Sequence, residues 1–288
     1  MAIKRFSSKD ITRVKSLINL LDDEDNSIYV IARDHLISMG EIALPLLESH
    51  LHVDEPVLQE RVKEAYEVIT SAILKEQIRA YREKYKEDMN LEEGVLLIAK
   101  YGYPQIDMRT FSDLLNFFAS ELQTRLDFSD SPEEIVAKIG KYFSEEKGFS
   151  GSEVDYYDGD YHYINKVIET KKGVPISLCV IYLLVLGRLN LPVKGVGMPG
   201  HFIIRYGFGT KHILADPFHG GKILSLEDCK NYLVQMGYTF SDEYLDPVNN
   251  KQILERMIRN LILVFEKQNY SYKVQTFLQC IDILNLNL

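Results

Sequence analysis

Three side chains of this sequence could together carry acyl chemistry: Cys179, His201 and Asp216. A thiol, an imidazole and a carboxylate are the groups that a cysteine enzyme uses as nucleophile, base and orienting partner. The carboxylate would accept the proton of one imidazole nitrogen and leave the other nitrogen free as a base. The residue types therefore predict a Cys-His-Asp site, on the condition that the fold brings the three groups together.

The pairing of His201 with Asp216 depends on a hairpin. Alternating apolar and polar residues predict three strands, at 193–198, 201–207 and 211–218. If residues 207–210 form the turn, Tyr206 faces Lys211, and the same register places His201 directly opposite Asp216 on one face of the sheet. A histidine–aspartate pair with a purely structural role is the alternative interpretation.

The position of Cys179 is the open question. The segment VPISLCVIYLLVLGRLN predicts a helix with Pro175 in its first turn, and its apolar residues on nearly all sides indicate a central, buried helix. A reactive cysteine belongs at a helix N-terminus, where free amides and the dipole stabilise the thiolate. Cys179 stands one turn beyond Pro175, about 6 Å deeper along the axis. Either the helix start is offset and Cys179 reaches His201, or Cys179 is a core residue.

Other polar residues near this helix have simpler expected roles. Ser177 lies closer to the helix start, where capping or hydrogen bonding is expected more than nucleophilic attack. A metal site is conceivable from four side chains: Cys179, His201, Asp216 and His219. The sequence offers no close ligand pair such as HxxxH or CxxC for it, and it contains no glycine-rich phosphate cradle. We therefore predict no metal and no cofactor.

Helices are expected on both sides of the strands. Helical spacing through residues 1–88, with two acidic turns before similar helices, gives this region a HEAT-like character. Gly40 stands where a helix would stop, and Ser131 with Pro132 and Glu134 is a helix-start signal. A tyrosine-rich loop follows, and paired glycines after Asp216 indicate a tight turn. The predicted class is α+β, with helices flanking a small antiparallel sheet.

Composition limits the possible partners and the compartment. The net charge of -9 disfavours binding to nucleic acid or to an anionic membrane surface, so a protein partner or protein substrate is expected. The longest apolar run is too short to span a bilayer, and no apolar stretch follows the opening MAIKRFSSKD, so no secretory signal is expected. Three widely spaced cysteines suit neither a disulfide framework nor a zinc knuckle, which favours a cytoplasmic location.

Several motifs resemble a known family. GVPISL, YLLVLGRLNLPVKGVGMPGHFIIRY and LADPFHGG are similar to the transglutaminase-like superfamily, and most closely to its SirB-type subgroup. The resemblance implies a papain-like core over 89–245, after the helical HEAT-like segment 1–88 and before a tetratricopeptide-like helical tail over 246–288. It also implies cysteine-dependent acyl transfer or amide hydrolysis, with His201 and Asp216 matching the family histidine and aspartate. The family cysteine falls near Pro175, so Cys179 comes one turn late.

Two functions from different classes therefore stay open. The first is a Cys-His-Asp enzyme for acyl transfer or amide hydrolysis. The second is a non-catalytic protein-interaction or regulatory module that retains the fold, which flanking helical repeats favour because stacked helix pairs expose concave surfaces. The sequence alone does not decide whether the protein is an enzyme.

Overall fold

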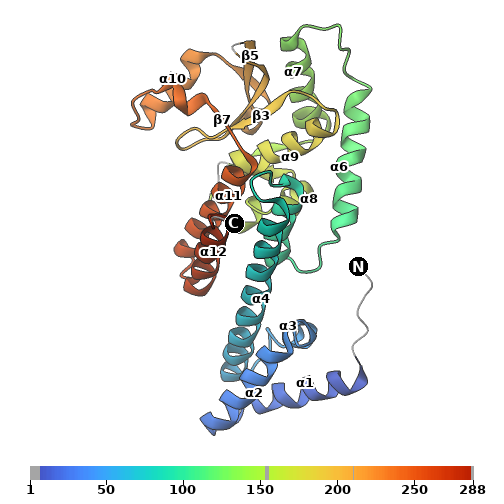
Figure 1. Cartoon of the computed structure of the whole chain (residues 1–288), viewed down its shortest axis with the longest axis vertical. Helices are drawn as coiled ribbons and strands as arrows, with labels where there is room; N and C mark the ends of the chain where they lie inside the picture. The colour runs from blue at the N-terminus through green and yellow to red at the C-terminus, as the bar shows by residue number, and fades with distance from the viewer. Residues whose placement is uncertain (1–6, 153–155, 210, 287–288) are drawn as a thin grey trace. The chain divides into compact units, whose positions relative to one another are not determined.

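A computed structural model describes residues 7–152, 156–209 and 211–286 of the chain. Parts of three sequence features lie outside the described residues: the opening MAIKRF, residues 153–155 of the tyrosine-rich loop, and Thr210 of the hairpin turn. The backbone divides into two compact units, Met1–Ala80 and Tyr81–Leu288, both of which are drawn in Figure 1. The domain boundaries expected after 88 and 245 remain predictions.

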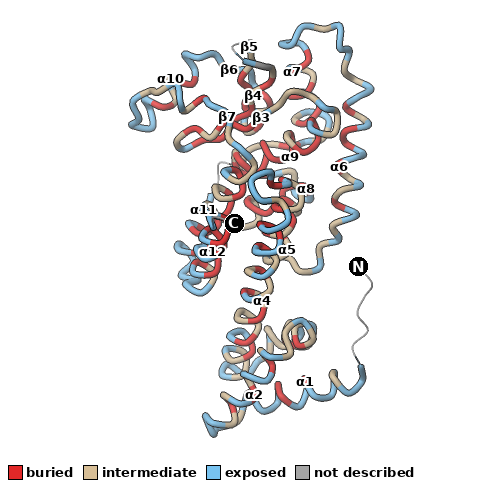
Figure 2. The backbone as a smooth tube through the Cα atoms, in the orientation of Figure 1, coloured by how far each residue is buried: buried red, intermediate tan, exposed pale blue. Residues whose placement is uncertain are grey.

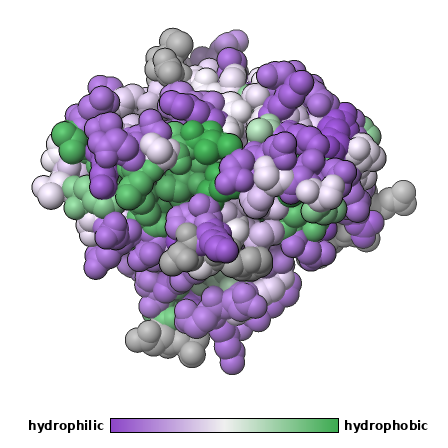
Figure 3. Space-filling view, turned by 90° about the horizontal axis from the view of Figure 1, so that it is seen from above, coloured by the Kyte–Doolittle hydropathy of each residue, from purple (hydrophilic) through white to green (hydrophobic). Residues whose placement is uncertain are grey.

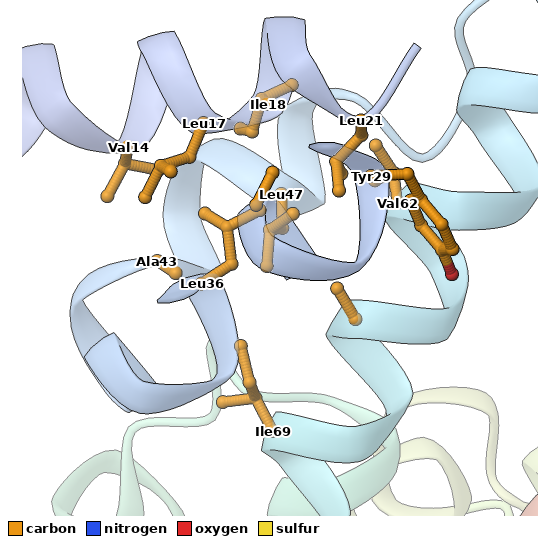
Figure 4. Close-up of a cluster of buried hydrophobic side chains, with 12 residues drawn as sticks. Val14, Leu17, Ile18, Leu21, Tyr29, Leu36, Ala43, Leu47, Val62 and Ile69 are labelled. Atoms are coloured by element: carbon orange, nitrogen blue, oxygen red, sulfur yellow. The ribbon is translucent and has the colours of Figure 1, made fainter. Parts of the chain in front are cut away.

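All the regular elements among the described residues of the first unit are helical. Its elements are α1 (Ser8–Leu20), α2 (Asn26–Met39), the 3-10 turn η1 (Gly40–Ile42), α3 (Leu44–Ser49) and most of α4 (Pro56–Tyr85). Gly40 ends α2 with φ +55°, as expected from the sequence. Aliphatic side chains from α1, α2, α3 and α4 converge on one core, which includes Leu17, Leu36 and Leu47 (Figure 4).

Arg61 of α4 caps the end of α1 inside this unit. Its Nη1 donates to the carbonyl oxygens of Leu21 at 2.6 Å and Asp23 at 2.9 Å, and its guanidinium lies 4.2 Å from the Tyr29 ring centroid. We expect Arg61→Met to destabilise the unit by about 2 kcal/mol, because two buried carbonyls lose a charged donor. Faster amide hydrogen exchange in α1 and α2 would report the loss. Arg79→Met, an exposed position on the same helix, should leave exchange unchanged; equal effects would contradict the assignment.

The second unit contains helices and two sheets. The helical elements are α5 (Leu91–Gly102), α6 (Met108–Gln123), α7 (Pro132–Lys141), the π-turn η2 (Tyr142–Glu146), η3 (Gly159–Tyr161), α8 (Ile164–Thr170), α9 (Pro175–Arg188), η4 (Pro217–His219), α10 (Leu226–Gln235), η5 (Asp242–Leu245), α11 (Asn250–Lys267) and α12 (Ser271–Leu284). The strands are β1 (Ser150–Gly151), β2 (Lys172–Gly173), β3 (Val193–Val196), β4 (Ile203–Phe208), β5 (Lys211–Asp216), β6 (Lys222–Leu224) and β7 (Pro247–Val248). The predicted α+β class is confirmed.

The main sheet of this unit lies between two helices. Its strand order is β6-β5-β4-β3-β7, antiparallel throughout, while β1 and β2 form a short parallel pair. Helix α9 is buried along most of its length and packs against β3 and β4 (Figures 1 and 2). Helix α10 covers the opposite face, where its Cys229 and Leu233 pack with Ile203 and Leu214. Within the described residues, none of the helices is both long and apolar enough to cross a bilayer.

The register of the hairpin differs from the predicted one. Phe208 pairs with Lys211, so β4 continues two residues further than expected, and the predicted turn over 207–210 is wrong. His201 is therefore not directly opposite Asp216. Because the error is two residues, it does not exchange the faces of the sheet, and the two side chains remain diagonal neighbours on one face. A register error of an even number of residues keeps each side chain on its predicted face of the sheet. The wrong turn therefore still predicted the right pair of side chains.

Candidate functional site

His201 and Asp216 meet at the open end of the hairpin. His201 precedes β4 and follows a bend at Gly200, whose φ is +74°, while Asp216 is the last residue of β5. The imidazole Nε2 of His201 donates to Oδ2 of Asp216 at 2.7 Å, and both side chains are almost completely buried. This contact fixes the ring and leaves Nδ1 of His201 as the free nitrogen.

A second histidine shares the same carboxylate. His219 ends the 3-10 turn η4, and its Nδ1 donates to Oδ2 of Asp216 at 2.7 Å, while Oδ1 of Asp216 accepts the Phe218 amide at 3.0 Å. Although burial favours the neutral acid, hydrogen bonds from His201 and His219 hold the pKa of Asp216 below its usual range. This contact was not predicted from the sequence, although the spacing Asp-Pro-Phe-His could have indicated it, because a 3-10 turn aligns residues i and i+3.

The two histidines border a cavity of about 320 Å³ between the sheet and α10. Its walls are formed by Met198, His201, His219, Lys222, Leu224, Asp228, Cys229, Asn231, Tyr232 and Gln235. The ring of Tyr232 lies 5.1 Å from that of His201, and its hydroxyl donates to the Gly200 carbonyl at 3.1 Å. No local pattern in the sequence indicates a role for Tyr232, because nothing in the order of residues relates α10 to His201. The cavity is therefore a product of the tertiary fold.

Cys179 does not line this cavity. It is the fifth residue of α9, has no exposed surface, and its Sγ donates to the carbonyl oxygen of Phe202 at 3.3 Å. Burial, followed by the negative charge of Asp216, holds the pKa of the Cys179 thiol well above its usual range. Helix α9 packs on one face of the sheet, whereas α10 and the cavity lie on the other. These surroundings favour a neutral thiol in the core.

Cys229 is the thiol that lines the cavity with His201. Only 1% of its surface is exposed, and burial, followed by the charges of Asp228 and Asp216, raises its pKa to about 11. A thiolate needs the opposite surroundings, with nearby cations or a free helix N-terminus. No motif in the sequence distinguishes Cys229, and the environment of this thiol is that of a buried apolar residue.

Two further polar side chains, Ser177 and His162, pack into the core. Ser177 is fully buried, and its hydroxyl lies 2.8 Å from the Tyr161 carbonyl and 3.0 Å from the Val174 carbonyl, which fits the expected hydrogen-bonding role. His162 donates from Nε2 to the Tyr156 carbonyl at 2.8 Å, and burial lowers its pKa. Neither side chain lines the cavity beside His201.

Arg256 of α11 holds the backbone that carries His201. Its Nη2 lies 2.9 Å from the carbonyl oxygens of both Met198 and His201, and its guanidinium lies 5.6 Å from the Phe202 ring centroid. One side chain therefore fixes both ends of the bend that precedes β4. The contact spans 55 residues to His201, so no local pattern in the sequence could have indicated it.

Comparison with known proteins identifies the family of this core. The family model of the transglutaminase-like superfamily matches residues 109–259, which is more than half of the chain. The chain belongs to the transglutaminase-like superfamily. The match includes α9, the hairpin, the cavity and Arg256, so the histidine–aspartate pair lies in the family's own part of the molecule.

Proteins similar to this chain come from bacteria and animals. A UPF0162 protein of Xylella fastidiosa is 32% identical over 189 residues, which cover 64% of this chain and 67% of the relative. A UPF0162 protein of Vibrio cholerae is 25% identical over 202 residues, covering 68% and 72%. F-box only protein 21 of mouse is 27% identical over 158 residues, covering 52% of this chain and 25% of that protein.

The family match and the UPF0162 relatives fit the resemblance that the motifs indicate. The UPF0162 proteins are consistent with the SirB-type subgroup, while the HEAT-like and tetratricopeptide-like character of the flanking helices remains a prediction. No solved structure matches the chain. The family is therefore established by sequence, and the residues of its cavity have to be interpreted from their own geometry.

Proposed function

We propose that this protein is a non-catalytic interaction module that retains the transglutaminase-like fold and binds a protein partner in the cytoplasm. The observation that carries the proposal is the burial of Cys179. A nucleophile has to meet its substrate, yet this thiol has no exposed surface, and it donates a hydrogen bond to the Phe202 carbonyl oxygen. The charge of the chain supports a protein partner over nucleic acid or an anionic membrane.

An apolar surface beside the cavity supports the interaction part of this proposal. Ile223, Leu224 and Leu226 line a cleft of about 500 Å³ with residues of β5 and η5, and Leu226 is 48% exposed. Val234 and Met236 near the end of α10 are also exposed. Figure 3 shows a contiguous hydrophobic area on the face of the molecule that is seen from above. Exposed apolar areas with polar rims are typical of protein-binding surfaces.

Alkylation of Cys179 tests the loss of thiol chemistry. We expect no labelling of Cys179 by iodoacetamide in the native protein between pH 5 and pH 8 on the order of hours, because burial keeps the thiol protonated and shielded. All three cysteines should react after denaturation, which is the internal control. Fast labelling below pH 7 that His201→Ala abolishes would refute the proposal.

A substitution in the cleft tests the interaction. We expect Leu226→Arg to reduce recovery of a specific partner about tenfold or more, because it replaces an exposed apolar side chain of the cleft with a charged one. Leu278→Arg is the matched control, since Leu278 is an exposed leucine on α12. A partner that the wild-type and Leu278→Arg proteins retain, and that the Leu226→Arg protein loses, would support the cleft. Equal recovery with all three would contradict it.

A Cys-His-Asp enzyme for acyl transfer or amide hydrolysis is the second candidate. The contact between Nε2 of His201 and Oδ2 of Asp216 favours it, because this is how a carboxylate orients a catalytic base. The candidate requires that the Cys179 thiol leave the Phe202 carbonyl and reach the free nitrogen of His201. The alkylation experiment separates the two candidates directly.

A further inference from the structure

Three metal-ligating side chains converge at the cavity. His201, Asp216 and His219 each offer one ligand atom, and these atoms all lie within 4.8 Å of one another. Metal bonds to imidazole nitrogen and carboxylate oxygen are about 2.0–2.2 Å long, so neighbouring ligands of a tetrahedral ion are about 3.4 Å apart. Small rotations of side chains that already touch would therefore create the coordination sphere.

The donor set is one that zinc and related ions use. Two imidazoles and one carboxylate form the protein part of many open sites for divalent transition metals. A catalytic base requires only one imidazole on its aspartate, so the hydrogen bond from His219 is not explained by the dyad alone. Each imidazole now donates to Asp216 from the nitrogen that would bind an ion, so binding would shift that proton to the other ring nitrogen.

The surroundings favour an ion with an open coordination position. His201 and His219 line the cavity, whereas the Asp216 side chain lies behind them and is only 5% exposed. The Phe218 amide fixes the second oxygen of this carboxylate, as outer contacts do at metal sites. The cavity of about 320 Å³ leaves space for water or for the carboxylate of an incoming group.

We propose that His201, Asp216 and His219 bind one divalent transition-metal ion of the zinc type, with an open position toward the cavity. The sequence favoured no metal because it contains no close pair of ligands, but the hairpin and the η4 turn bring distant residues together. The proposal concerns the α10 face of the sheet and is independent of the alkylation of Cys179, which lies on the α9 side. Failure of the metal proposal would therefore leave the proposed function intact, and failure of the proposed function would leave the metal proposal intact.

Metal titration of the full chain tests the site. Protein stripped with a chelator is titrated with Zn²⁺ by calorimetry and with Co²⁺ by visible absorption. We expect one equivalent per chain at micromolar affinity or tighter, with Co²⁺ bands of a four- or five-coordinate site and no sulfur charge-transfer band. His219→Ala should weaken binding by about 100-fold or more. The side chain of His219 is half exposed, so this variant should fold.

A matched control and a direct readout complete the experiment. His212→Ala removes a histidine from β5, the strand that carries Asp216, and should leave affinity unchanged. Nitrogen NMR of labelled histidine should show the signals of His201 and His219 shifting together when Zn²⁺ is added to the wild-type protein. Absence of binding, equal affinity in all variants, or a sulfur charge-transfer band would each overturn the proposal.

Discussion

Replacing Gly221 by alanine will destabilise the protein by about 3 kcal/mol, because the new Cβ adds overpacking to the strain of a left-handed backbone. Gly221 has φ +81°, and an added Cβ would lie 2.4 Å from the Cα of Gly140 in α7. The Gly140 atom in this contact belongs to the backbone, so it cannot move aside by a side-chain rotation. The Gly221 amide also donates to the Asp216 carbonyl at 2.7 Å. A displacement of the Gly221 backbone would therefore also move Asp216, which holds His201 at the cavity.

The neighbouring glycine provides the control. Gly220 has φ +72°, but its added Cβ would meet only the Ser144 side chain at 3.5 Å, an ordinary contact. Gly220→Ala should therefore have only the cost of the left-handed conformation, about 1–2 kcal/mol. Urea unfolding, monitored by circular dichroism, measures the free energy of unfolding of both variants. Equal losses would mean that the close approach of α7 to the turn contributes nothing.

Local patterns predicted the elements well. Ser131 and Glu134 form a complete capping box at the start of α7, and Pro175 is the first residue of α9, both as the sequence indicated. Capping, proline placement and apolar periodicity depend on neighbours in sequence, so they could be read without a structure. The paired glycines after Asp216 both adopt positive φ, which agrees with the expected tight turn.

Contacts between distant segments explain what the sequence could not predict. The turn between β4 and β5 was placed two residues early because Gly207 resembles a turn glycine, yet it lies within β4 at φ +110°. Its added Cβ would lie 2.6 Å from the Lys211 carbonyl, so glycine is needed inside the strand itself. The cavity with Tyr232, the thiol of Cys229 and the contacts of Arg256 depend on α10 and α11 packing against the hairpin, for which no local signal exists.

The position of Cys179 relative to the histidine–aspartate pair follows from the two faces of the sheet. His201 and Asp216 could be matched from strand periodicity, because both lie on one hairpin. Whether Cys179 reaches them depends on how α9 packs beneath the sheet, and the thiol instead contacts the Phe202 carbonyl. Sequence spacing indicates a displacement of one turn, and in the structure the thiol is shielded in the core on the α9 side, outside the cavity that His201 borders.

Replacing Arg256 by methionine is expected to destabilise the protein by about 3 kcal/mol, because the Met198 and His201 carbonyls lose a charged donor. Methionine retains an apolar stem over the Phe202 ring, so the loss reports the hydrogen bonds more than the packing. The bend that carries His201 would also loosen. Urea unfolding gives the stability, and amide exchange in the segment around His201 gives the local effect.

Arg259 of the same helix gives the matched control, because its side chain is exposed and the substitution removes the same charge. Arg259→Met should change stability by less than about 0.5 kcal/mol. Arg256→Lys should recover part of the loss, since one ammonium can reach a carbonyl but lacks the planar fork of the guanidinium. Full stability in Arg256→Met, with unchanged exchange around His201, would show that α11 does not hold this bend. The position of the imidazole would then depend on Asp216 and on the rings around it, Tyr232 among them.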